Sequence, residues 1–151
     1  MYSVFDIANY YLQITPMSPK KMQKIVYYAY AWFLTLMNED RNHLDNRLFD
    51  ERPEAWVHGP VFPELYKKYK SFGYDEIKES EEPPLLSNDV KDILDDVWGV
   101  YGSFSANELE SISHQEKPWI NARENYSRFE PCTCVLSDKD IFDCYSSRID
   151  V

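Results

Sequence analysis

The stretch Ser18–Met37, SPKKMQKIVYYAYAWFLTLM, decides the fold of this chain. Ser18 followed by Pro19 predicts a helix start, because serine caps free backbone N–H groups and proline fits the first helical turn. Apolar residues then recur at helical spacing: Met22, Ile25, Val26, Ala29, Phe33, Leu36 and Met37. Trp32 and Leu34 widen this stripe, so we expect a central helix that is buried over much of its surface.

Further helices are predicted on both sides of this stretch from apolar spacing and capping residues. They cover residues 4–14, 63–72, 87–101, 106–113 and 118–124, and a last helix begins at Ser137. Pro16 ends the first of them, and Gly73 and Gly102 follow the second and third. The run Ser105-Ala-Asn-Glu108 is a capping box, in which each of the two end side chains bonds the other residue's backbone N–H.

Residues 38–61 lack helical periodicity and contain Pro53 and the pair Gly59-Pro60. We expect an irregular connection there, with short extended pieces around Leu48-Phe49 and Trp56-Val57. Glycine and proline together predict a rigid turn at Gly59-Pro60. Trp56 and Tyr66 should then anchor this segment in the core or in a groove.

The predicted fold class is all-α, a compact bundle of six or seven helices, with room for a short two-stranded β element around residues 47–58. A charged, proline-containing linker is expected over residues 74–86. The chain length suits a single domain over residues 1–151.

The chain carries 26 acidic and 16 basic residues, a formal net charge of −10. Such a surface repels phosphate, which argues against nucleic-acid binding and favours a basic protein partner. Acidic residues gather in one run: Asp75, Glu76, Glu79, Glu81, Glu82, Asp89, Asp92, Asp95 and Asp96. We interpret this run as a solvated face that can also steer a basic partner.

The remaining composition argues for a cytoplasmic protein without cofactors. No apolar stretch is long enough to cross a membrane, and the start MYSVFDIANYYLQ lacks the features of a signal peptide. Cys132, Cys134 and Cys144 are an odd number, so we expect reduced thiols. The pair Cys132 and Cys134 lacks the second ligand pair of a structural zinc site, and we predict no metal.

No phosphate loop, dinucleotide fingerprint or nucleophile elbow occurs in the chain. The best enzymatic constellation is His58 near Glu54, joined by His114 and Glu116 from a later helix end, which could bind a metal or act as acid and base. In the alternative interpretation, which we favour, His58 fixes a turn and His114 completes the end of a helix. Ser105 as a nucleophile is weaker, since capping already explains it.

Several stretches resemble the Panacea domain of SocA-like antitoxins and phage-associated GepA-like proteins. They are Asp6-Ile-Ala-Asn-Tyr-Tyr-Leu12, Met22-Gln-Lys-Ile-Val-Tyr-Tyr-Ala-Tyr-Ala-Trp32, Glu54-Ala-Trp-Val-His-Gly-Pro-Val-Phe-Pro-Glu-Leu-Tyr66, Tyr69-Lys-Ser-Phe-Gly73, Val97-Trp-Gly-Val-Tyr-Gly102, Ser105-Ala-Asn-Glu-Leu109, His114-Gln-Glu-Lys-Pro-Trp119 and Ala122-Arg123. The matches are collinear over about residues 4–124, and residues 125–151 are poorly matched.

The resemblance implies an all-helical antitoxin of a type II system. Such a protein neutralises a cognate toxin protein, encoded by a neighbouring gene, in a bacterial or prophage setting. The SocA branch also implies an alternative, a proteolytic adaptor that delivers its toxin to a protease, for which residues 125–151 are the candidate segment. A His/Glu-dependent hydrolase is the less favoured alternative.

The resemblance also marks motif residues as candidates for partner binding: Gln23, Tyr27, Tyr30, Trp56, His58, Gly59, Pro60, Tyr66, Trp98, Ser105, His114, Glu116 and Trp119. Two positions depart from the family pattern. Lys20-Lys21 stands where the family usually has a Leu-Lys pair, and Tyr30 replaces the usual glutamine of the YAQAW segment. If that glutamine contacts a partner, the choice of partner differs here.

Overall fold

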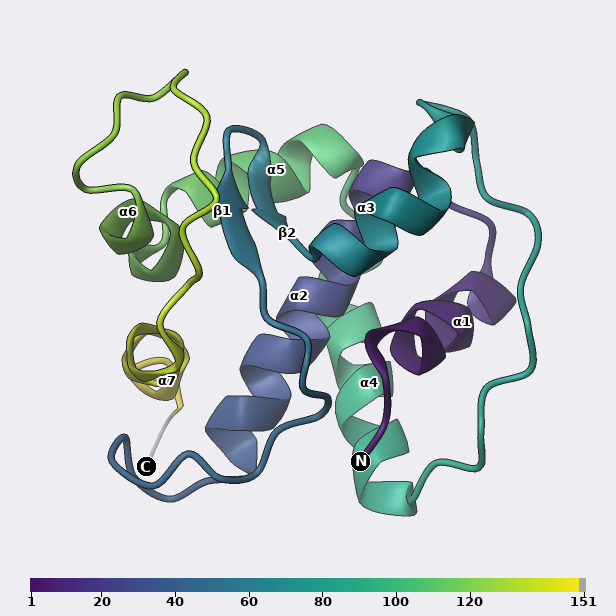
Figure 1. Cartoon of the computed structure of the whole chain (residues 1–151). Coiled ribbons are helices and arrows are strands. Elements are labelled where there is room, and N and C mark those ends of the chain that lie inside the picture. Colours follow the sequence, from purple (N-terminus) through teal and green to yellow (C-terminus); the bar gives the residue numbers. More distant parts are fainter. Residues whose placement is uncertain (150–151) are drawn as a thin grey trace.

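The computed structural model describes residues 1–149 and confirms an all-α fold with one small sheet (Figure 1). The helices are α1 (Val4–Ile14), α2 (Pro19–Leu36), α3 (Pro63–Tyr69), α4 (Asn88–Tyr101), α5 (Ala106–His114), α6 (Lys117–Ala122) and α7 (Asp138–Ser146). A 3₁₀ turn, Lys70–Phe72, extends α3, and strands β1 (Glu54–Trp56) and β2 (Gly59–Val61) form a hairpin. Among the described residues, no helix is long and apolar enough to cross a membrane.

Four of the predicted helix starts are confirmed by side-chain caps. The Ser18 hydroxyl accepts a hydrogen bond from the Lys21 backbone, and Ser87 and Ser137 cap α4 and α7 in the same way. Ser105 and its partner three residues on form the capping box of α5. These contacts are local, which is why sequence alone locates them well.

Helix α2 passes through the centre of the molecule and carries the core (Figure 1). Nearly every residue from Met22 to Thr35 is buried, as the broad apolar stripe indicates. The end of the stripe was predicted wrongly: Leu36 is 49% exposed and Met37 is 37% exposed. Residues 38–47 are mostly exposed and offer the last turn of α2 little cover.

Helices α1, α4, α5 and α7 and the β-hairpin all pack against α2 (Figure 1). Aromatic rings join these elements: Tyr28 stacks on Tyr101 of α4 with ring centroids 3.9 Å apart, and Trp32 lies 5.3 Å from Tyr145 of α7. Ile141 and Tyr145 are fully buried. The poorly matched segment after residue 124 therefore ends in a helix that belongs to the core.

The β element differs from its predicted position. Strand β1 pairs antiparallel with β2, with Trp56 opposite Gly59, so the turn consists of Val57 and His58. Gly59 and Pro60 begin the second strand and do not form the turn. Phe49 makes only an isolated bridge to Tyr2. The error arose because a Gly-Pro pair ordinarily marks a turn. Here Gly59 is the first residue of β2, has a positive φ of 109° and packs closely against Lys24.

The expectation of reduced thiols is wrong for two of the three cysteines. Cys132 and Cys134 are joined in a disulfide with their Cα atoms 5.4 Å apart, within the range that a disulfide spans. Their closeness in sequence made the pair look like half of a metal site. Cys144 is free and half-buried.

Candidate functional site

Two consecutive residues of α2 form hydrogen bonds with the backbone of the β-hairpin and of the residue that follows it. The amide of Gln23 bonds both polar groups of the Phe62 backbone, donating to its carbonyl at 3.0 Å and accepting from its N–H at 2.9 Å. The Nζ atom of Lys24 donates to the Pro60 carbonyl at 3.1 Å. Strand β2 and the residue that follows it are therefore fixed by buried side chains through backbone atoms.

Strand β1 is held from the side by α6 and the residue that follows it. The indole N–H of Trp119 donates to the Trp56 carbonyl at 2.8 Å, and the guanidinium of Arg123 donates to the Ala55 carbonyl at 2.8 Å. The Ala55 N–H donates in turn to the Cys134 carbonyl at 2.8 Å. Hydrogen bonds from residues far away in sequence thus restrict the backbone of both strands, which makes the hairpin rigid.

Gly59 is required by the side chain beneath it. A Cβ atom at this position would lie 2.7 Å from Cε of Lys24 and 3.0 Å from Oγ of Ser113. Lys24 itself is 1% exposed, and burial lowers the pKa of its amine from 10.5 to about 7. The glycine lets the hairpin pack directly against the buried Lys24, and burial disfavours the protonated, charged form of its amine.

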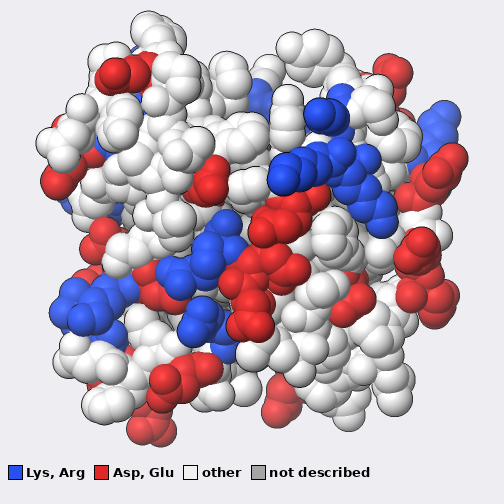
Figure 2. Space-filling view, in the orientation of Figure 1, with Lys and Arg blue, Asp and Glu red and all other residues white. Residues whose placement is uncertain are grey.

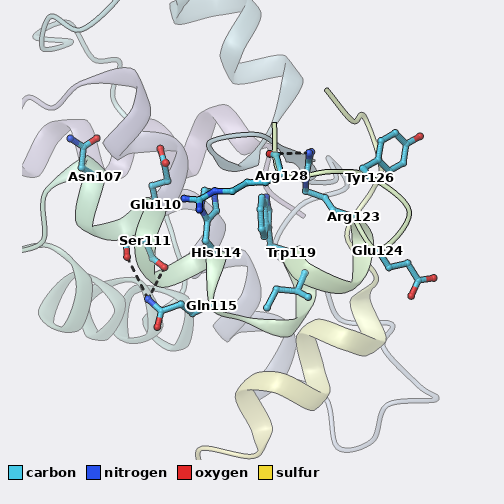
Figure 3. A pocket seen from close by; sticks show the side chains of 11 residues that line it. Asn107, Glu110, Ser111, His114, Gln115, Trp119, Arg123, Glu124, Tyr126 and Arg128 are labelled. Atoms are coloured by element: carbon cyan, nitrogen blue, oxygen red, sulfur yellow. Dashed lines mark hydrogen bonds between the residues drawn. The ribbon is translucent and has the colours of Figure 1, made fainter. Parts of the chain in front are cut away.

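A hollow of about 600 Å³ opens beside the hairpin, between α5 and α6 (Figure 3). The ring of His114 stacks on the indole of Trp119 with centroids 4.1 Å apart, and the guanidinium of Arg123 lies 5.3 Å from that indole. Figure 3 shows the side chain of Arg128 reaching over His114 toward Glu110. Burial lowers the pKa of His114, so the imidazole is neutral at pH 7.

Glu110 is the charged centre at the rim of the hollow. Its carboxylate pairs with Nζ of Lys20 at 2.6 Å and with Nδ1 of His58 at 3.1 Å. Burial alone would raise the pKa of Glu110, but the hydrogen bond and charge of Lys20 outweigh burial and hold that pKa below its ordinary value. Glu110 therefore stays ionised and connects the hairpin turn to α2 and α5.

Glu116 lies inside the fold, away from this rim. Its carboxylate is 6% exposed and accepts hydrogen bonds from Tyr28 at 2.7 Å, from Tyr145 at 3.0 Å and from Arg148 at 2.7 Å. These partners come from α2, α7 and the residues after α7. Glu116 thus joins the segment between α5 and α6 to both the centre and the end of the chain.

The predicted enzymatic constellation does not come together. His58 bonds Glu110, Glu54 accepts from the Trp56 indole at 2.9 Å, and Glu116 is buried among tyrosines. The described residues contain no group of three His, Cys, Asp or Glu side chains that could hold a metal ion. His114, Trp119 and Arg123 instead form a concave surface of stacked rings with a guanidinium beside them.

The outward part of the hairpin is aromatic. The ring of Trp56 meets the ring of Tyr66 edge to face at 4.9 Å, and Tyr66 is 46% exposed. Trp56 is half-buried, so the expectation that this pair anchors the segment in the core is only partly met. In Figure 2, basic side chains gather over α3, whose last turn carries Lys67 and Lys68. The surface over α3 is therefore less acidic than the net charge suggests.

Other motif candidates lie within the fold. Tyr27 and Tyr30 are 1% and 0% exposed, and the Tyr30 hydroxyl donates to Asp138 at the start of α7 at 2.7 Å. Because Tyr30 cannot reach the surface, its departure from the family pattern affects the docking of α7 and not a direct partner contact. Trp98 is half-buried beneath the ammonium of Lys21, at 5.5 Å, and Ser105 caps α5.

Three residues of this site were missed by sequence reasoning as site candidates: Lys24, Arg123 and Glu110. A lysine inside the apolar stripe of α2 was a signal for Lys24, because lysine is almost never fully buried without a specific role. Arg123 stands in the matched pair Ala122-Arg123, but nothing in that pair indicates its contact with the hairpin, and Glu110 gave no signal. Their partners are backbone atoms and side chains that only the fold brings near.

The fold and the site together describe a helical domain that presents a rigid hairpin and a shaped hollow on its surface. The family model of the SocA-like antitoxin, Panacea domain, matches residues 22–120. This range includes Gln23, Lys24 and Trp119, which bond the backbone of the hairpin or of Phe62, but not Arg123. The chain belongs to this family, as its motifs predicted. No curated protein and no solved structure matches the chain.

Proposed function

We propose that this chain is the antitoxin of a type II toxin–antitoxin pair, which neutralises its cognate toxin protein by direct, stoichiometric contact. One observation carries the proposal beyond family membership. The side chains of Gln23, Lys24, Trp119 and Arg123 each form hydrogen bonds with backbone atoms of the hairpin or of Phe62, the residue that follows it. These motif side chains shape a surface, and a surface is what neutralisation by binding needs.

The hairpin face has the composition of a binding surface. Trp56 and Tyr66 supply an aromatic pair, and tyrosine and tryptophan are the residues that most often dominate binding energy at interfaces. His58, with a side chain that is 74% exposed, stands at the turn between the strands. Because the backbone beneath is already fixed, little conformational entropy is lost when a partner binds.

The proposal assigns the protein to the bacterial cytoplasm, encoded by a chromosomal or prophage gene beside its toxin. The proteolytic adaptor stays the alternative. It needs a segment that an unfoldase can engage, and the candidate segment contains both the exposed residues 125–131 and helix α7. Ile141 and Tyr145 of α7 are fully buried, so that helix would have to leave the core before an unfoldase could engage it, and residues 125–131 are the accessible part of the segment. We prefer direct contact because it needs no such second partner.

The test is expression of the neighbouring toxin-like reading frame with and without this chain in a growth assay. The proposal predicts that growth stops with the neighbour alone and recovers with the pair, and that the two proteins purify as one complex. Tyr66→Glu should weaken protection, while the control Tyr74→Glu, at a side chain that is 97% exposed and follows the 3₁₀ turn after α3, should not. Recovery of growth without any complex would overturn direct contact.

A further inference from the structure

A second surface of this chain is an apolar groove between α2 and α4, with a volume of about 180 Å³. Leu36 and Val100 form its exposed edges, with exposures of 49% and 61%. Its floor includes Trp32 and Tyr101, which are locked together by a 3.0 Å hydrogen bond from the indole N–H to the phenol oxygen. The groove is thus apolar, preformed and large enough for one bulky side chain.

Carboxylates line the α4 side of this groove. Asp96 is itself a lining residue, and Asp92 and Asp89 precede it by about one and two helical turns. All three are exposed, and none forms an ion pair with another residue in the described range 1–149. Asp95 differs, because the Tyr10 hydroxyl of α1 bonds it. The acids beside the groove are therefore free for a partner.

We propose that this groove receives a large apolar side chain of the toxin, carried on a lysine- or arginine-rich segment whose cations face Asp92 and Asp96. The inference rests on the proposed function and names the chemistry of the partner. Charge complementarity decides the occupant. A second copy of this chain would set the same acids against each other across a two-fold axis, and the net charge of −10 adds to that repulsion.

The groove and the hairpin contact different residues of α2. Gln23 and Lys24 hold the hairpin and Phe62 near the start of α2, whereas Trp32 and Leu36 line the groove near its end. Eight residues, about two helical turns or about 12 Å along the axis, separate Lys24 from Trp32. No hairpin residue lines the groove, so the two surfaces can be tested independently.

The experiment measures binding of the purified product of the neighbouring toxin gene to folded variants of the whole chain. Val100→Glu should raise Kd at least about tenfold, since it sets a charge against an apolar anchor. Its matched control is Leu85→Glu, at an apolar residue that is 96% exposed in the linker. The double variant Asp92→Lys with Asp96→Lys should slow association about tenfold at low salt. The control Asp75→Lys with Glu76→Lys changes the net charge equally and should slow association less.

A photo-crosslinking residue placed at position 100 completes the test and should join the chain to the toxin. Cross-linking of the chain to itself would overturn the inference in favour of self-association. Unchanged binding of the Val100 and Asp92/Asp96 variants, with a wild-type chain that protects cells, would reject the groove and leave the proposed function standing. A wild-type chain that neither binds nor protects would reject both.

Discussion

The phenol of Tyr28 donates a 2.7 Å hydrogen bond to the carboxylate of Glu116, 88 positions further along the chain. The same carboxylate holds Tyr145 and Arg148, so one buried acid links the central helix to the end of the fold. This explains why a motif that suggests catalysis, His-x-Glu-x-Pro-Trp, contains a glutamate that does not face solvent.

Glu116→Ala should destabilise the protein by about 3 kcal/mol, because it leaves the buried phenols of Tyr28 and Tyr145 without their acceptor and removes the ion pair with the partly exposed Arg148. The free energy of unfolding in urea measures this. Glu124→Ala is the matched control at an exposed carboxylate and should change that free energy by less than about 0.5 kcal/mol. Equal effects of the two variants would show that Glu116 has no structural role.

Gly59→Ala should cost about 2 kcal/mol or more, since the residue has a φ of 109° and its new Cβ would meet Lys24 at 2.7 Å. The control is Gly99→Ala in α4, where a Cβ meets nothing within 4 Å. There alanine should be neutral or stabilise by up to about 1 kcal/mol, because it favours the helix. Thermal unfolding of both variants checks the contrast, and a Gly59→Ala protein as stable as wild type would contradict the close approach.

Lys24 gives the protein a specific dependence on pH. Its folded pKa of about 7 lies below the ordinary 10.5, so between these values the unfolded chain holds a proton that the folded chain lacks. The free energy of unfolding should therefore rise as pH increases from about 7, by at most about 1.4 kcal/mol per unit, and the full cost of burial applies below that pH. Lys24→Met should lose this rise. Identical slopes for both proteins from about pH 7 to about pH 9 would refute a neutral buried amine.

Tyr66→Ala should speed dissociation of the toxin complex with little loss of stability, since the side chain is 46% exposed. Trp56→Ala should also speed dissociation. The hydrogen bond from the Trp119 indole goes to the backbone carbonyl of residue 56, so this substitution leaves it intact. An increase in the dissociation rate of about tenfold or more is typical when an aromatic anchor is lost. Tyr74→Ala is the control, and dissociation rates equal to wild type in all three would exclude the hairpin face.

The helices could be predicted from sequence because their starts depend on neighbours a few residues away. Ser18, Ser87, Ser105 and Ser137 all cap the helices that begin after them. The stripe of α2 likewise indicated a buried central helix. Local signals of this kind need no knowledge of the tertiary fold.

The hairpin and the site could be predicted only in part, because they depend on contacts between distant residues. Gly59 lies against Lys24 and pairs with Trp56, so the turn consists of Val57 and His58 and not of the Gly-Pro pair. The disulfide between Cys132 and Cys134 depends on how residues 132–134 bend, which spacing alone leaves open. Sequence patterns identified the family correctly but could not tell a buried Glu116 from one that faces a substrate.

The most direct test of the account is titration of the purified toxin's activity with this chain, followed by separation of the two proteins under denaturing conditions and mass measurement of the toxin. Neutralisation by contact predicts that inhibition is complete only near an equimolar ratio, that the toxin mass is unchanged, and that refolded toxin regains its activity. Inactivation by a small molar fraction of this chain, or a toxin that is cleaved or modified, would contradict neutralisation by contact and require a catalytic role.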